Sequence, residues 1–259
     1  ISKSDYLSHF TEEELKKEKN VVCEEIKMYE DTPDDIVHDI LSQAVYEKHP
    51  LGYPILGTDK ILDTINSETL KQYVYNHYTP DKVVISIAGN VDESFIKQVE
   101  GLFGSYEGGT ARPELEKPTF HTNKIVRKKD TEQAHLCLGY NGYDIGNENI
   151  YSLITLNNVL GGSMSSRLFQ NVREEKGLAY SVYSYHTSYQ DNGMVVIYGG
   201  TGANQVHQLY DTIQETLTEL RNDGITAKEL DNCKEQLKGS LMLSLESTNS
   251  RMSRNGKNE

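Results

Sequence analysis

Two glutamates, Glu18 and Glu25, stand seven residues apart in a segment whose residues favour a helix. Because seven residues make nearly two turns of an α-helix, both carboxylates leave it on one face. That face borders an apolar stripe that should pack on a core, formed by Leu15, Val22, Ile26 and Tyr29. Carboxylates held beside packed protein can serve as a metal ligand or a general base. The alternative is a solvated acidic helix with glutamate–lysine pairs one turn apart.

The composition is that of a globular protein and narrows the classes of partner. With 259 residues the chain is long enough for two domains, and no apolar run approaches the roughly 18 residues that span a membrane. The net charge of −13 argues against nucleic acid and anionic membranes as partners. Three widely spaced cysteines, Cys23, Cys137 and Cys233, indicate reduced core thiols in a cytoplasmic protein rather than a disulfide framework.

The hydrophobic periodicity predicts an α+β chain. Capping boxes at Thr11–Glu14 and Thr226–Glu229 open two helices, the second of which runs past Leu245. Ser67 is predicted to cap a third helix, and another ends at Phe103. Further helices are predicted over residues 33–45, 150–160, 167–175 and 205–222, and strands over 83–88, 124–127, 133–140, 180–189 and 194–199.

Residues 107–119 have the composition of a linker. They contain two glycines, two prolines and alternating charge, without hydrophobic periodicity. We therefore expect a first domain over residues 1–106 and a second over residues 120–259.

The two helices that open with capping boxes resemble each other beyond their caps. Six residues match at a constant offset of 215, as between Thr11 and Thr226, which indicates an internal repeat. The alternative is convergence of two well-capped amphipathic helices. In this register Glu18 corresponds to Cys233 and Glu25 to Ser240, so only the first half carries the carboxylates. The counterpart of the glycine turn in the second half would precede Ile1, and we expect the first domain to lack its N-terminal part.

Several short motifs occur together and in order. They are Glu18-x6-Glu25, Asp31-Thr-Pro-Asp-Asp, His49-Pro-Leu-Gly, Tyr78-Thr-Pro80, Gly161-Gly-Ser-Met-Ser-Ser-Arg-Leu-Phe-Gln170 and Val172-Arg-Glu-Glu-Lys-Gly-Leu-Ala-Tyr180. In this combination the chain resembles the pitrilysin/insulinase zinc peptidases, and among them the bacterial relatives of the mitochondrial processing peptidase. The resemblance implies two similar domains, each a mostly antiparallel sheet with helices on one face, which form a clam-like chamber.

This family binds Zn2+ through an inverted H-x-x-E-H helix and a distant glutamate. The resemblance implies that Glu25 is that distant ligand and that Glu18 is a supporting acid. No H-x-x-E-H stands in the sequence, and the nearest string, His9-Phe-Thr-Glu12-Glu13, lacks the second histidine. The chain therefore holds one zinc ligand of three, and we expect it to be inactive alone.

The resemblance also assigns a role to two residues in the second half of the chain. Arg173 and Tyr180 are similar to an arginine–tyrosine pair that stabilises the negative charge of a tetrahedral intermediate. Their alternative is a surface arginine and a tyrosine that begins a strand.

Two further pairs are candidates for binding substrate. Asp35 and Asp39 share one helix face and could bind a basic side chain of a peptide, or simply face solvent. Gly161 and Gly162 could let an extended peptide approach the backbone, or could end the preceding helix.

The first hypothesis for function is a zinc endopeptidase that cleaves short or unfolded peptides. The expected substrates include basic peptides, and a homodimer is a possible assembly. The second is a non-catalytic companion subunit of the same fold. The third is an unrelated α+β binding protein.

Overall fold

The computed structural model describes residues 10–105 and 116–258. By contacts the chain divides into two units, which are described separately. Unit 1 consists of Ile1–Ile26, Leu56–Leu115 and Leu237–Glu259, and unit 2 of Lys27–Ile55 and Glu116–Gln236. Most of the linker predicted over 107–119 lies outside the described residues, and the domain boundaries stay a prediction.

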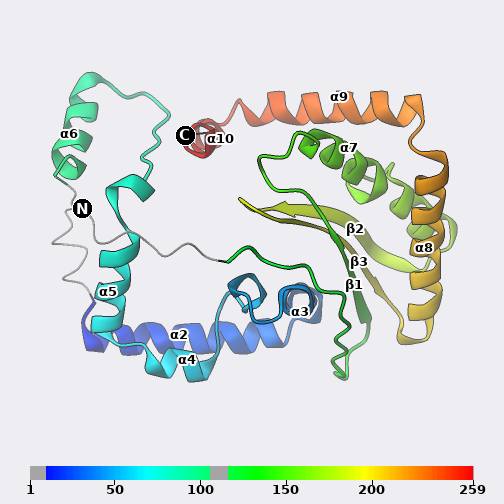
Figure 1. The fold of residues 1–259 in the computed structure, drawn as a ribbon, viewed down its shortest axis with the longest axis horizontal. Coiled ribbons are helices and arrows are strands. Elements are labelled where there is room, and N and C mark those ends of the chain that lie inside the picture. The colour runs from blue at the N-terminus through cyan, green and yellow to red at the C-terminus, as the bar shows by residue number, and fades with distance from the viewer. Residues whose placement is uncertain (1–9, 106–115, 259) are drawn as a thin grey trace. The chain divides into compact units, whose positions relative to one another are not determined.

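Unit 2 is built on a three-stranded antiparallel sheet (Figure 1). The strand order is β1-β3-β2, so that β3 lies in the centre. The bounds are Ala134–Asn141 for β1, Ala179–Ser188 for β2 and Gly193–Thr201 for β3. These three strands confirm the predictions over 133–140, 180–189 and 194–199.

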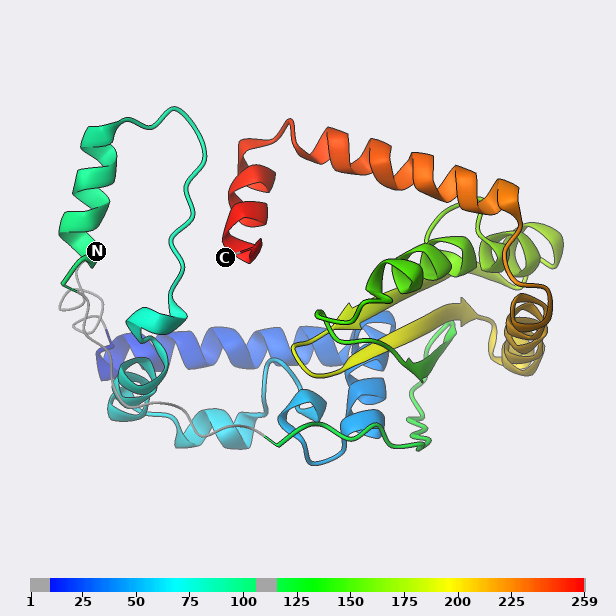
Figure 2. The same ribbon diagram turned by 45° about the horizontal axis from the view of Figure 1, so that its top comes forward.

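Helices cover both faces of this sheet (Figure 2). Val196 and Ile197 follow each other in β3, and both are fully buried. Because successive side chains of a strand point to opposite faces, both faces of the sheet must be covered. Ile197 packs with α7 (Ile150–Gly161), the π-helix η3 (Phe169–Glu175) and α8 (Val206–Asp223).

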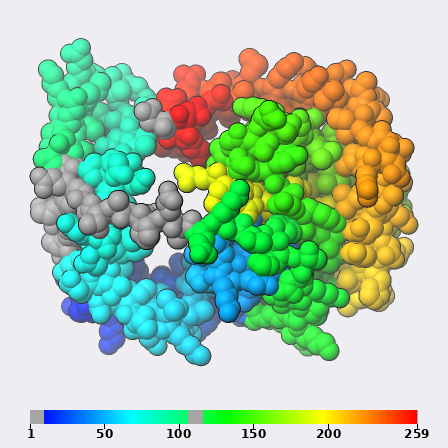
Figure 3. All heavy atoms as spheres, in the orientation of Figure 1, coloured from blue at the N-terminus to red at the C-terminus, as the bar shows by residue number. Residues whose placement is uncertain are grey.

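On the other face, Val196 packs with α3 (Pro33–Tyr46). The chain after residue 116 also lies against α3 (Figure 3), and the His121 amide donates to the Val45 carbonyl over 2.9 Å. The predicted α+β class with an antiparallel sheet is confirmed. In unit 2 helices lie on both faces of the sheet, because residues of opposite parity in β3 are both apolar and both need cover.

Unit 1 is helical. Its helices are α4 (Asp59–Thr64), α5 (Ser67–His77), α6 (Glu93–Phe103), α10 (Thr248–Asn258) and parts of α2 (Glu12–Glu30) and α9 (Ala227–Ser244). Sequence patterns missed α4 and α10, and the helix expected to run past Leu245 ends at Ser244. None of the helices within residues 10–105 and 116–258 is long and apolar enough to cross a membrane.

Two predicted strands are wrong. Residues 83–88 and 124–127 form no strand, and neither joins a ladder with another described segment. An apolar run becomes a strand only where a neighbouring strand satisfies its backbone groups. In the second segment the Arg127 side chain instead pairs with Glu30, and the nearby Lys129 ammonium lies 2.9 Å from the Asp31 carboxylate.

The helix caps follow the sequence closely. At both capping boxes the glutamate accepts from the backbone amide of the threonine, over 3.3 Å for Thr11 and Glu14 and over 2.7 Å for Thr226 and Glu229. The prediction for Ser67 is wrong by one residue, because the Asn66 side chain accepts from the Thr69 amide over 2.9 Å and is the cap.

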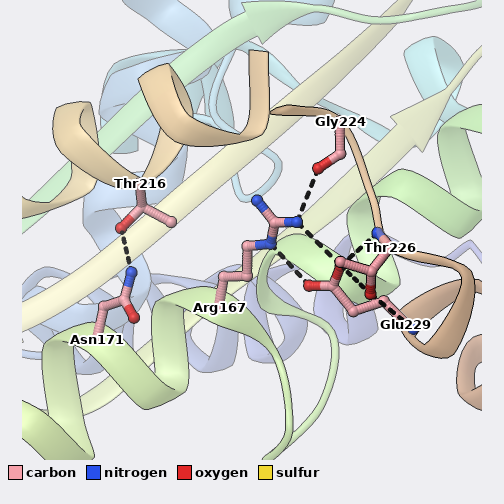
Figure 4. Close-up of polar contacts among 6 residues, drawn as sticks. All are labelled: Arg167, Asn171, Thr216, Gly224, Thr226 and Glu229. Atoms are coloured by element: carbon pink, nitrogen blue, oxygen red, sulfur yellow. Dashed lines mark hydrogen bonds and ion pairs between the residues drawn. The ribbon is translucent and has the colours of Figure 1, made fainter. Parts of the chain in front are cut away.

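The second capping box is joined to a partly buried ion pair (Figure 4). The Arg167 guanidinium donates to both carboxylate oxygens of Glu229, over 2.7 and 2.9 Å, and to the Gly224 carbonyl over 2.7 Å. The hydrogen bond from Arg167 is the main reason that the pKa of Glu229 falls to about 2. One arginine therefore ties the start of η3 to the end of α8 and the beginning of α9.

We predict that Arg167→Gln lowers the free energy of unfolding at pH 7 by about 1–3 kcal/mol, because Glu229 loses its charged partner in a partly buried place. The contribution of Glu229 is complete above its unfolded pKa near 4.5 and is lost as pH falls through about 2. The variant should lose most of this acid dependence and keep the part that comes from the Thr226 hydrogen bonds. Urea unfolding followed by circular dichroism measures both effects.

The matched control is Lys17→Gln, which removes an ion pair whose side chains are 72% and 80% exposed. Its cost should stay below about 0.5 kcal/mol, since exposed pairs on one helix face stabilise little. Equal costs for the two variants would contradict the proposed role of Arg167.

Candidate functional site

Arg173 and Tyr180, which the sequence paired, are brought together in unit 2. The Arg173 Cζ atom lies 4.6 Å from the centroid of the Tyr180 ring and 4.7 Å from that of Phe169. These are cation–π distances, and such contacts fix a guanidinium without using its N–H groups.

The backbone at Tyr180 is a β-bulge. Ala179 pairs with Thr201 and Ser181 pairs with Gly200, so that Tyr180 between them is the extra residue of β2. The Tyr180 side chain is 78% exposed. Bulges are common beside active sites because they redirect one side chain without breaking the sheet.

Arg173 also stands on irregular backbone. It belongs to η3, whose π-helical winding is rare and is frequent at functional sites. Val172 beside it is fully buried and its carbonyl accepts from the Leu178 amide over 2.9 Å. Gly177 between them has a φ of +58°, a left-handed conformation that glycine adopts without strain. This turn brings β2 back towards the helix that carries Arg173.

One side chain of η3 and one of the turn that follows it bind to α8 and hold both segments in place. The Asn171 amide donates to Thr216 over 3.0 Å (Figure 4), and the Lys176 ammonium donates to Thr212 over 3.1 Å. Because Thr212 and Thr216 are almost fully buried, these bonds hold η3 at a defined depth. The result is an arginine with a set direction and a tyrosine hydroxyl open to solvent, which together can donate to an anionic oxygen.

Glu18 and Glu25 lie on α2 and are both exposed. The apolar stripe beside them is only half-buried, and α2 buries no residue. No group of three histidine, cysteine, aspartate or glutamate side chains that could hold a metal occurs among the described residues. The roles of Glu18 and Glu25 stay predictions.

Asp35 and Asp39 differ in their surroundings. Asp35 is exposed, and its backbone carbonyl accepts from the Tyr29 hydroxyl over 3.1 Å. Asp39 is half-buried, and burial raises its pKa. Hydrogen bonds from the Ile55 backbone and the Tyr29 side chain lower this pKa and partly offset the rise. Asp35 is therefore the more accessible of the two for a basic ligand.

Gly161 ends α7 against the sheet. A Cβ atom there would lie 2.4 Å from the Ser184 backbone nitrogen, so only glycine permits this approach of helix and strand. Gly161 is buried, whereas Gly162 is exposed at the end of the helix. The packing explains Gly161 without a substrate, and contact of either glycine with a peptide stays a prediction.

Sequence reasoning missed a polar cluster around His38. The His38 Nδ1 atom lies 2.8 Å from the Tyr185 hydroxyl and 3.6 Å from the Cys137 Sγ atom, and Nε2 lies 3.3 Å from the Tyr183 hydroxyl. Tyr183 and Tyr185 alternate along β2, a period that could have marked one face of the strand. Nothing in the sequence indicated that α3 would supply a histidine to that face.

Comparison with protein families gives two matches that together cover most of the chain. Residues 64–237 match the model described as "Peptidase M16 inactive domain", and residues 5–59 match "Insulinase (Peptidase family M16)".

The curated relatives are longer than this chain. It is 71% identical over 252 residues to an uncharacterized zinc protease of Bacillus subtilis, YmxG, covering 97% of this chain and 62% of that protein. It is 36% identical to an uncharacterized zinc protease of Streptomyces coelicolor, covering 96% of this chain and 56% of that protein. The chain thus spans about three fifths of the length of the curated relatives it matches.

Solved structures have the same fold. A peptidase M16 inactive domain from Pseudomonas fluorescens aligns with a TM-score of 0.86 at 26% identity, over 96% of this chain and 60% of that one. A protease from Helicobacter pylori aligns with a TM-score of 0.84 at 22% identity, over 95% of this chain and 62% of that one, which shows the fold alone.

The relatives' names imply zinc, but the residues present do not make a complete zinc site. In the described parts of the chain Glu25 belongs to no group of three possible metal ligands, and the sequence has no H-x-x-E-H string. A structural zinc site needs four ligands and a catalytic one needs three from protein.

We predict that acid weakens unit 2 through His38. Burial lowers the pKa of His38, so the unfolded chain takes up this proton first as pH falls below the ordinary value of 6.5. The free energy of unfolding should therefore decrease from pH 6.5 down to the lowered pKa of the folded state. His38→Gln should flatten this slope, as measured by urea unfolding at a series of pH values.

Other charged groups near the His38 ring determine how much of the pH dependence His38→Gln can remove. Asp34 and Asp35 raise the His38 pKa, and burial also lowers the pKa of the neighbouring His135, so part of the slope should persist. His207→Gln, at an exposed position on α8, is the control and should leave the slope as it is. An unchanged slope in His38→Gln would show that the cluster does not exclude the charged imidazole.

Proposed function

The chain belongs to the M16 (insulinase) family of peptidases, and on this basis we propose that it forms part of a zinc-dependent endopeptidase for short or unfolded peptides. The proposal extends to a polypeptide that includes this chain together with an H-x-x-E-H segment. The proposal is supported by the names of the relatives, which describe them as uncharacterized zinc proteases.

The observation that carries the proposal is the contact between Arg173 and Tyr180. A surface arginine and a strand tyrosine have no structural need to meet, yet a π-helix and a β-bulge direct them at each other at 4.6 Å. Irregular backbone of this kind costs stability and is retained mainly where it serves a site.

We assign the pair a role in stabilising charge. When a peptide carbonyl is attacked by water, its oxygen becomes negative in the transition state. The N–H groups of Arg173 and the hydroxyl of Tyr180 can donate to that oxygen. Donors fixed before the reaction contribute most, because they need no reorganisation as the charge develops.

Other residues receive roles by the same resemblance. Glu25 would be the metal-ligating carboxylate, and Glu18 would orient it. Asp35 is exposed and could bind a basic side chain of the substrate. The outer strands β1 and β2 each have one edge not used by β3, and an extended peptide can add to such an edge.

The second candidate function is a non-catalytic companion subunit that binds peptides or partner proteins. The description of the matched family model as an inactive domain favours it. The presence of Glu18, Glu25, Arg173 and Tyr180 together favours the peptidase, because a scaffold needs none of them at these positions.

We predict that a polypeptide comprising this chain and an H-x-x-E-H segment cleaves an unfolded, arginine-containing peptide, and that a chelator abolishes cleavage until zinc is restored. Arg173→Ala should keep the zinc and lower kcat by about 100-fold or more, as expected for loss of one oxyanion donor. Peptide hydrolysis followed by mass spectrometry measures both.

Arg221→Ala, at an exposed position on α8, is the matched control and should retain full activity. Binding of the same peptide without cleavage, in a protein that carries zinc, would favour the companion subunit instead.

Zinc content tests the carboxylates independently of turnover. In the same polypeptide we expect Glu25→Gln to lose zinc, and Glu18→Gln to weaken zinc affinity by about 10–100-fold, as for supporting groups at metal sites. Glu24→Gln, next to Glu25 on the helix, should bind zinc normally. Normal zinc occupancy in Glu25→Gln would refute the ligand assignment.

A further inference from the structure

Phe169 has no function in the assignments above, although its ring contacts Arg173. The Arg173 Cζ atom lies 4.7 Å from the Phe169 centroid, almost as near as it lies to Tyr180. Phe169 is half-buried and belongs to neither core cluster of unit 2. Its ring is therefore not explained by the packing of the core.

We propose that Phe169 is a positioning residue, which holds the Arg173 guanidinium in the direction that charge stabilisation needs. This inference rests on the proposed peptidase function. Phe169 would not itself touch the substrate and would act through Arg173.

The physical reason lies in the freedom of the arginine side chain. A free arginine side chain samples many rotamers, and much of this rotamer entropy is lost when the side chain is held in one direction. Contact with the π face of a ring restricts the planar guanidinium while its in-plane N–H groups stay available for an acceptor. Two rings restrict it more than Tyr180 alone, whose own side chain is 78% exposed.

A competing partner for Arg173 stands next to it. The Glu174 carboxylate lies 3.9 Å from the Arg173 Nε atom, and its side chain is 54% exposed. If the guanidinium turned fully towards this carboxylate, its donors would be occupied. An exposed ion pair stabilises weakly, and a cation–π contact is of similar strength and can balance it. The Phe169 ring is thus of the right strength to decide the direction of Arg173.

Phe169 is itself well fixed. Leu168 before it is fully buried, and the Gln170 side chain after it donates to the Met164 carbonyl over 2.7 Å. The Gln170 amide donates to the Ser166 carbonyl over 3.0 Å. The start of the π-helix is therefore a rigid support for the ring.

The test compares Phe169→Leu, which removes the ring and keeps apolar bulk, with Phe169→Tyr, which keeps the ring. Tyr210→Leu, an aromatic 43% exposed on α8, is the control. The first readout is the Nε–H proton resonance of Arg173 in the 259-residue chain, which nearby rings shift. We expect Phe169→Leu to lose much of this ring-current shift and the other two variants to keep it.

The second readout is peptide cleavage by the polypeptide that includes the H-x-x-E-H segment. Phe169→Leu should lower kcat about tenfold with little change in KM, since a contact used only in the transition state is weakened. Phe169→Tyr should retain kcat. Phe169→Leu combined with Glu174→Gln should regain part of it, which a merely structural role of Phe169 would not produce.

The outcomes separate the two proposals. An active parent protein whose kcat is unchanged in Phe169→Leu, or whose KM alone rises, overturns the role of Phe169 and leaves the peptidase intact. An unchanged Nε–H resonance in Phe169→Leu overturns it as well. A parent protein with zinc but without cleavage overturns the proposed function, and with it the catalytic purpose of Phe169.

Discussion

The pairing of β2 with the buried strand β3 is the constraint on which the candidate site depends. Thr201 of β3 is nearly fully buried, and its hydroxyl donates to the Leu178 carbonyl over 2.6 Å at the entrance to β2. This hydrogen bond fixes the turn that begins at Gly177. The position of that turn then determines the distance between Arg173 and Tyr180. The site lies at the surface, but its geometry is determined by a strand that is covered on both faces.

Local signals in the sequence predicted more than non-local ones. The capping boxes, most helices of unit 2 and the strands of its sheet follow from residues close together in the chain. The sequence could not show that residues 83–88 join no ladder with another described segment, because strand formation depends on a partner that the pattern does not reveal. The bulge did leave a trace in the sequence, since the apolar residues Ala179 and Val182, both buried in the structure, are three positions apart, whereas one face of a regular strand repeats every two.

The predicted repeat places two unlike environments at equivalent positions. Glu18 on α2 is exposed, whereas Cys233, its counterpart on α9, is 2% exposed and its thiol donates to the Thr155 carbonyl over 3.8 Å. A helix of the same pattern thus presents carboxylates in one half and packs a thiol in the other. Periodicity gives the helix, but the polarity of single positions decides what the helix does.

The bulge in β2 means that the fold and the site can be separated in evolution. If Tyr180 were deleted, Ala179 and Ser181 would become neighbours and would still face Thr201 and Gly200, so the ladder would continue without a gap. Ala179 and Val182 would then be two residues apart and would share one face in a regular way. The domain could lose its outward tyrosine in a single step and keep its core, so the candidate site depends on a residue that the sheet itself does not need.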